Sequence, residues 1–93
     1  EEDKQEPVLS AFARHAGKPV FSMEGAARHP LQGLADALTL RERLGEPRGQ
    51  RFVLTWAPHP KPLPMAVPNS AVEAAALLGM EVVIARPEGF HLD

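Results

Sequence analysis

The residues best suited to chemistry form the run His29-Pro30-Leu31-Gln32. If a helix starts here, His29 and Gln32 lie three residues apart on one side of it. An imidazole can donate a hydrogen bond to an oxygen that becomes anionic, and a carboxamide both donates and accepts. The pair therefore suits a planar carbamoyl or amide group. The alternative is an ordinary helix N-terminus with an exposed histidine and glutamine, and such N-termini are more common than binding sites with this spacing.

Two further residues stand where a substrate could be held. Glu24 precedes His29 by five residues, at the end of an expected strand, and could bind a cationic or N–H group. His59 lies between two prolines, whose rigidity would preorganise its side chain. A surface carboxylate and a loop histidine are the alternatives. Arg28 could pair with a phosphate, but we prefer to interpret it as a surface arginine beside Glu24.

Other kinds of site find no support in the residues. The chain has no cysteine and its four histidines lack metal-ligand spacing, so we expect no metal site and no cofactor. A net charge of -2 gives no electrostatic case for nucleic acid or an anionic membrane. No apolar run reaches the roughly 18–20 residues that a membrane span needs. We therefore expect no nucleic-acid or membrane partner.

The elements that must position these residues alternate between helix and strand, which favours an α/β fold with a parallel sheet. Helical spacing or capping predicts helices at 7–17, 29–45 and 71–79, the last with Asn69 and Ser70 as N-cap residues. Short apolar runs predict strands at 19–23, 52–56 and 80–85. The break at 45–50 is a linker, and it separates either two strands or two sheets.

The candidate residues fall in two loops that follow expected strands. In open parallel sheets, ligands bind beyond the carboxyl ends of the strands, which selects the loops 24–32 and 57–70. Both loops lead into helix N-termini, which attract anions. Five prolines between 58 and 68 make the second loop stiff, and we expect Trp56 before it to be core or pocket wall.

Two motifs carry a resemblance to a known family. The run His29 to Asp36, HPLQGLAD, resembles the His-Pro-x-Gln-x-Leu-Ala-Asp signature of aspartate and ornithine carbamoyltransferases. The run Thr55 to Ser70, TWAPHPKPLPMAVPNS, is similar to the proline-rich loop of N-acetylornithine and N-succinylornithine carbamoyltransferases. The resemblance extends from about residue 7 to residue 93, and the two motifs in this order are specific.

The resemblance implies a fold made of parts of two parallel-sheet, Rossmann-like carbamoyltransferase domains joined by a helix. Residues 1–28 would be the C-terminal part of the carbamoyl phosphate-binding domain. Residues 29–50 would be the connecting helix and linker, and residues 51–93 the start of the amino acid-binding domain. The family further implies a homotrimer at full length, a role in arginine biosynthesis and a cytoplasmic location.

The resemblance also implies a role for each candidate residue. His29, Pro30, Leu31 and Gln32 would bind carbamoyl phosphate, with His29 and Gln32 as the catalytic residues. Glu24 and His59 would bind the N-acylated ornithine. The implied partners are thus carbamoyl phosphate and N-acylornithine, with neither metal nor cofactor.

Departures from the family pattern bear on the acceptor. Met65-Ala66 stand where ornithine carbamoyltransferases carry paired asparagines, so plain ornithine is disfavoured. Pro64 stands where acetylornithine enzymes often have asparagine, which leans towards the succinyl type. The family's Ser-x-Arg-Thr phosphate motif is absent, so we expect a segment of a longer enzyme that is inactive by itself. The alternatives are an ornithine enzyme, a relative with another acceptor, or a non-catalytic binding or assembly domain.

Overall fold

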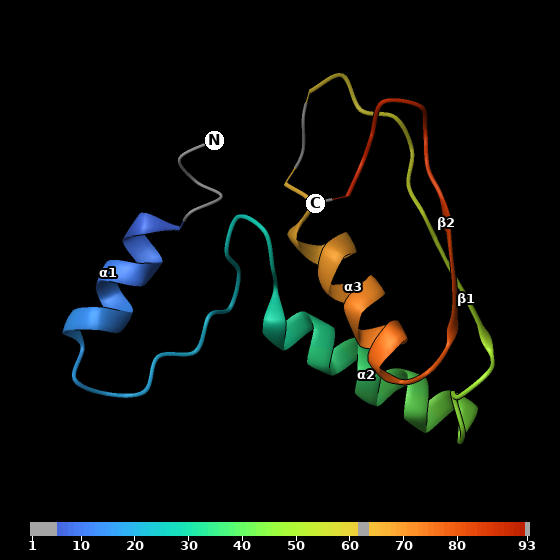
Figure 1. The fold of residues 1–93 in the computed structure, drawn as a ribbon, viewed down its shortest axis with the longest axis horizontal. Helices are drawn as coiled ribbons and strands as arrows, with labels where there is room; N and C mark the ends of the chain where they lie inside the picture. The colour runs from blue at the N-terminus through green and yellow to red at the C-terminus, as the bar shows by residue number, and fades with distance from the viewer. Residues whose placement is uncertain (1–5, 62–63, 93) are drawn as a thin grey trace.

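The computed structural model describes residues 6–61 and 64–92, and it has an α/β arrangement (Figure 1). The elements are α1 (Pro7–His15), α2 (Pro30–Leu44), β1 (Arg51–Thr55), α3 (Ala66–Leu77) and β2 (Glu81–Ala85). Helix α3 contacts α2 on one side and both strands on the other, so it is the middle layer of this part of the molecule. The predicted fold class is confirmed.

Strands β1 and β2 form a parallel pair, with Arg51 opposite Glu81 and Thr55 opposite Ala85. Parallel neighbours require a crossover between them, and α3 provides it. In β1, the half-buried Phe52 and Leu54 alternate with exposed residues, and Val53 is 55% exposed. The described residues therefore cover one face of β1 only.

The core between the layers is built from small side chains. Four alanines of α3 are buried, and the one buried residue of α2 is Gly33. A Cβ atom at Gly33 would lie 3.3 Å from both Cβ and the carbonyl oxygen of Ser70. The two helices therefore approach closely at this point because the glycine has no side chain.

Helix α2 confirms the prediction for residues 29–45. It begins at Pro30 and ends at Leu44, where Gly45 has φ 72° and turns the chain out of the helix. The linker that follows is bonded to the turn after α3, because the backbone N–H of Gly49 donates to the carbonyl oxygen of Gly79 at 2.9 Å.

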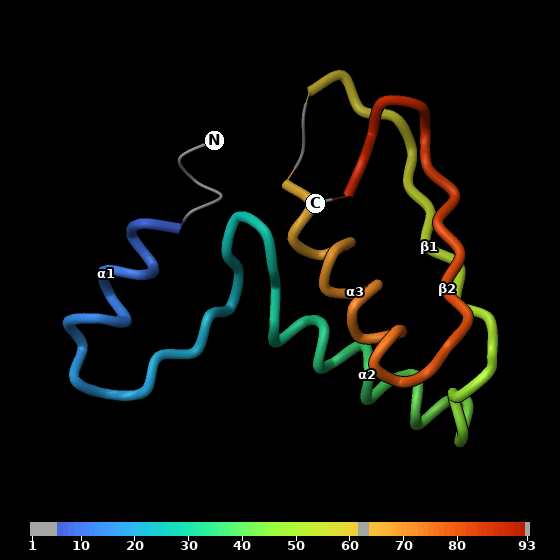
Figure 2. The backbone as a smooth tube through the Cα atoms, in the orientation of Figure 1, coloured from blue at the N-terminus to red at the C-terminus, as the bar shows by residue number. Residues whose placement is uncertain are grey.

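The predicted strand at 19–23 was wrong, since this segment has no regular structure. Phe21 and Met23 are 77% and 70% exposed. A strand needs a neighbour to bond its backbone groups, and none of the described residues pairs with this segment. Helix α1 likewise has no buried residue, and the tube view shows it apart from the other elements (Figure 2).

The prediction that Asn69 and Ser70 cap the third helix was also wrong. Helix α3 begins at Ala66, so both residues lie inside it, and the N–H of Asn69 donates to the carbonyl oxygen of Met65 at 2.9 Å. Pro68 falls in the first turn, where a helix needs no intrahelical N–H donor. The proline-rich loop therefore ends at Met65, and its residues 62–63 lie outside the described part.

Candidate active site

His29 is the N-cap residue of α2, and its ring folds back onto the helix. The ring Nδ1 accepts a hydrogen bond from the backbone N–H of Gln32 at 3.2 Å. Pro30 occupies the first helical position, where its missing N–H has no cost. When Nδ1 accepts this bond, Nε2 is the ring nitrogen left to act as an N–H donor. The N-terminus of α2 thus presents the Nε2 edge of one imidazole ring.

Gln32 is exposed, and its side chain does not meet the His29 ring. Its Nε2 donates to Oδ1 of Asp36, one turn further along α2, at 2.9 Å. The structure therefore brings His29 and Gln32 together through the backbone of Gln32 alone. Leu31, which precedes it, is 42% exposed.

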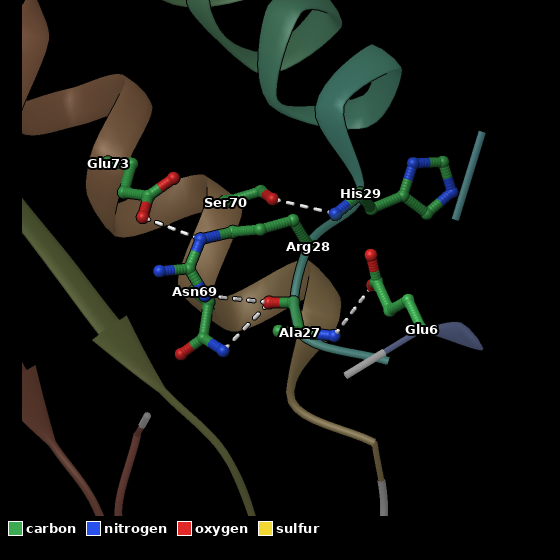
Figure 3. A network of polar contacts seen from close by, with 7 residues as sticks. All are labelled: Glu6, Ala27, Arg28, His29, Asn69, Ser70 and Glu73. Atoms are coloured by element: carbon green, nitrogen blue, oxygen red, sulfur yellow. Dashed lines mark hydrogen bonds and ion pairs between the residues drawn. The ribbon is translucent and has the colours of Figure 1, made fainter. Parts of the chain in front are cut away.

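Two buried polar side chains of α3 hold the segment that leads into α2 (Figure 3). Ser70 Oγ accepts a hydrogen bond from the backbone N–H of His29 at 2.8 Å. Asn69 Nδ2 donates to the carbonyl oxygen of Ala27 at 2.9 Å. Neither contact was predicted from the sequence. A polar pair within a run of small residues was the available signal, but asparagine and serine are also common N-cap residues.

Arg28 pairs with Glu73 of α3 rather than with Glu24. The distance from Arg28 Nε to Glu73 Oε1 is 2.6 Å, and the two side chains are 41% and 51% exposed. Arg28 is thus at the surface, as interpreted from the sequence, but its carboxylate partner is Glu73 because the guanidinium turns towards α3 (Figure 3). Glu24 itself is exposed, in the irregular segment before Gly25.

His59 lies exposed in the proline-rich loop, and its ring bonds to the loop itself. Nδ1 is 3.1 Å from the backbone N–H nitrogen and 3.0 Å from the carbonyl oxygen of Lys61, so the tautomer decides which of the two it bonds. This loop reaches α3 through Met65. Ser70 of α3 also bonds the backbone of His29. The segments that carry His29 and His59 therefore both contact α3.

A mostly apolar cavity of about 110 Å³ opens beside His59. Its lining residues are Trp56, Ala57, His59, Pro64, Met65, Pro68 and Phe90. Trp56 was expected to be core or pocket wall, and it is pocket wall. Its Nε1 is buried without a hydrogen-bond partner in the described part of the chain, which is an unfavourable state for a polar group. Glu24, His29 and Gln32 do not line this cavity.

The described residues form neither a metal site nor a membrane span. Within residues 6–61 and 64–92, no group of three or more histidine, aspartate or glutamate side chains could hold a metal ion. In the same part of the chain, no helix is both long enough and apolar enough to cross a bilayer.

Known proteins are similar to this chain over nearly its whole length. It is 50% identical over 93 residues to the N-succinylornithine carbamoyltransferase of Bacteroides fragilis, covering 100% of this chain and 29% of the relative. It is 47% identical over 87 residues to the N-acetylornithine carbamoyltransferase of Xanthomonas campestris, covering 91% of this chain and 25% of the relative. No protein-family model matches.

A solved structure agrees in fold. The crystal structure of an acetylornithine transcarbamylase complexed with acetylcitrulline has a TM-score of 0.89 and 44% identity, covering 99% of this chain and 28% of that one. The chain thus spans little more than a quarter of the length of the proteins it matches. By its sequence and its fold, the chain belongs to the aspartate/ornithine carbamoyltransferase family.

Proposed function

We propose that the protein carrying this sequence transfers the carbamoyl group of carbamoyl phosphate to the side-chain amine of an N-acylated ornithine, either N-succinylornithine or N-acetylornithine. The similarity to enzymes named for these two acceptors supports the proposal. The structural observation that carries it is the His29 ring, which presents an Nε2–H donor at the start of α2.

The chemistry needs such a donor. The amine nitrogen attacks the carbamoyl carbon, the carbon–oxygen bond to phosphate breaks, and phosphate leaves with the bonding electron pair while the amine loses a proton. During the attack the carbamoyl oxygen gains negative charge, and the Nε2–H of His29 donates to it. One such donor is worth about 10²–10³ in rate.

The remaining residues of this segment would hold the carbamoyl group. Gln32 would orient the carbamoyl NH2, and to do so its amide exchanges its present partner Asp36 for substrate. Pro30 and Leu31 would form the rest of the binding segment. Bringing the two substrates together in the right orientation supplies the other large contribution to the rate.

The acylornithine would lie between Glu24 and His59. Glu24 is an exposed carboxylate that suits an N–H group of the substrate, and His59 stands on the proline-rich loop beside the apolar cavity. Stiff flanking prolines lower the entropic cost of holding the His59 side chain in place.

The domain arrangement is proposed on the same basis. Residues 1–28 would belong to the carbamoyl phosphate domain, residues 29–50 would connect, and residues 51–93 would begin the amino acid domain. Helix α2 followed by the β1–α3–β2 unit supports this division. We further propose a homotrimer in the cytoplasm with a role in arginine biosynthesis, which size measurement and localisation of the intact protein would test.

The test is carbamoyl transfer by the intact protein with N-succinylornithine, N-acetylornithine and ornithine side by side. We expect product with an acylated acceptor and little with ornithine. Product with ornithine alone, or with none of the three, would refute the proposed acceptor class.

A second arm tests the role of His29. The substitution His29→Asn keeps a good N-cap residue for α2 but removes the ring donor. We expect kcat to fall about 10²–10³-fold while the melting temperature changes little. An unchanged kcat in this variant would exclude His29 as the oxyanion donor.

A further inference from the structure

Ser70 joins two segments that lie far apart in the sequence. Its Oγ is 2.8 Å from the backbone nitrogen of His29, a residue 41 positions away. The Ser70 side chain is only 5% exposed. A buried hydroxyl with a distant partner of this kind constrains the chain at both ends of the bond.

The bond fixes the backbone at the residue that carries the ring. His29 has φ −125° and ψ 78°, outside the helical region, and in this conformation its ring reaches the N–H of Gln32. The N–H of an N-cap residue has no partner inside its own helix. Ser70 supplies that partner, although a serine inside a helix commonly bonds a carbonyl oxygen one turn back instead.

Two neighbouring contacts make this point rigid. Asn69 holds the carbonyl oxygen of Ala27, two residues before His29. Gly33, four residues after His29, packs against Ser70 so closely that a Cβ would lie 3.3 Å from it. His29 is therefore held on both sides by the same turn of α3.

We propose that Ser70 is a positioning residue for the transfer step. It holds the backbone of His29 so that the ring caps α2 and directs its Nε2–H at the carbamoyl oxygen, a role that rests on the proposed function. Ser70 is buried and does not line the cavity beside His59, so we expect its loss to lower the rate of transfer rather than the affinity for acylornithine.

The kinetic test uses the intact protein with Ser70→Ala and Ser70→Cys. The cysteine keeps a similar volume but its sulfur is a weak acceptor, so it removes the bond without opening a cavity. Misplacing a catalytic group by about 1 Å can cost about 10²-fold. We expect kcat to fall about 10–100-fold in both variants, with the KM for acylornithine within about twofold of the wild type. Ser10→Ala, the same change at an exposed position of α1, is the control.

A second readout does not depend on turnover. The ¹⁵N shifts of the His29 ring report its tautomer, and we expect protonated Nε2 and bare Nδ1 in the wild type but averaging in Ser70→Cys. A single fixed tautomer and unchanged kcat in the Ser70 variants would overturn the positioning role. If the wild type transfers no carbamoyl group, the proposed function fails, and the tautomer measurement still decides whether Ser70 positions the ring.

Discussion

Replacing Gly33 by alanine tests the close approach of α2 and α3. In an exposed helix interior this change stabilises by about 1 kcal/mol, because alanine is the better helix former. At Gly33 the new Cβ would lie 3.3 Å from Cβ and the carbonyl oxygen of Ser70. Overpacking of this kind costs about 1–3 kcal/mol. We therefore expect Gly33→Ala to lower the free energy of unfolding by about 0–2 kcal/mol.

A larger side chain at Gly33 separates the effect of helix propensity from the cost of overpacking more clearly. Valine has a poorer helix propensity than alanine and adds two methyl groups at the contact. We expect Gly33→Val to cost about 3 kcal/mol or more. Because Ser70 must move to admit either side chain, kcat should fall along with the stability.

The assay is urea unfolding of the intact protein followed by circular dichroism. Ala35→Gly, at an exposed position of α2, is the matched control, and it should cost about 1 kcal/mol through helix propensity alone. A Gly33→Ala variant that is about 1 kcal/mol more stable than the wild type, with unchanged kcat, would refute the close packing of these helices.

Further changes separate the contacts that hold the site. Asn69→Leu removes the donor to the partly buried carbonyl oxygen of Ala27 and should cost about 1–3 kcal/mol in urea unfolding, and a cost below about 0.5 kcal/mol would contradict the bond. Glu73→Gln breaks the partly exposed ion pair with Arg28 and should lower the free energy of unfolding by less than about 1 kcal/mol. The loss should be smaller at high salt, and a loss that stays the same at high salt would contradict a solvent-exposed ion pair. His59→Ala should raise the KM for acylornithine about 3–10-fold, the loss of one hydrogen bond, and leave the KM for carbamoyl phosphate unchanged; equal shifts in both would argue against its role. The 93-residue chain alone should give no turnover, because its described strands form a two-stranded sheet with an open face, and measurable product would refute this expectation.

The sequence by itself determined the elements whose signals are local. Helical spacing between a histidine–proline pair and Gly45 predicted α2, and the alternation of strand, helix and strand after residue 50 predicted the parallel β1–α3–β2 unit. Such patterns suffice because a helix or a crossover is specified by residues close in sequence. The same local runs carried the family resemblance. The roles of Glu24, Gln32 and His59 stay predictions for the kinetic assays.

The tertiary structure decided which local signals were misleading. The apolar run 19–23 is typical of a strand, but it has no neighbouring strand among the described residues to bond its backbone. Asn69 and Ser70 have the composition of a helix cap, yet they bind Ala27 and His29, about 40 residues away. Whether a polar side chain caps its own helix or holds another segment depends on what packs against it. That partner is chosen by the fold, because burial obliges each polar group to find a bond wherever the packing brings one.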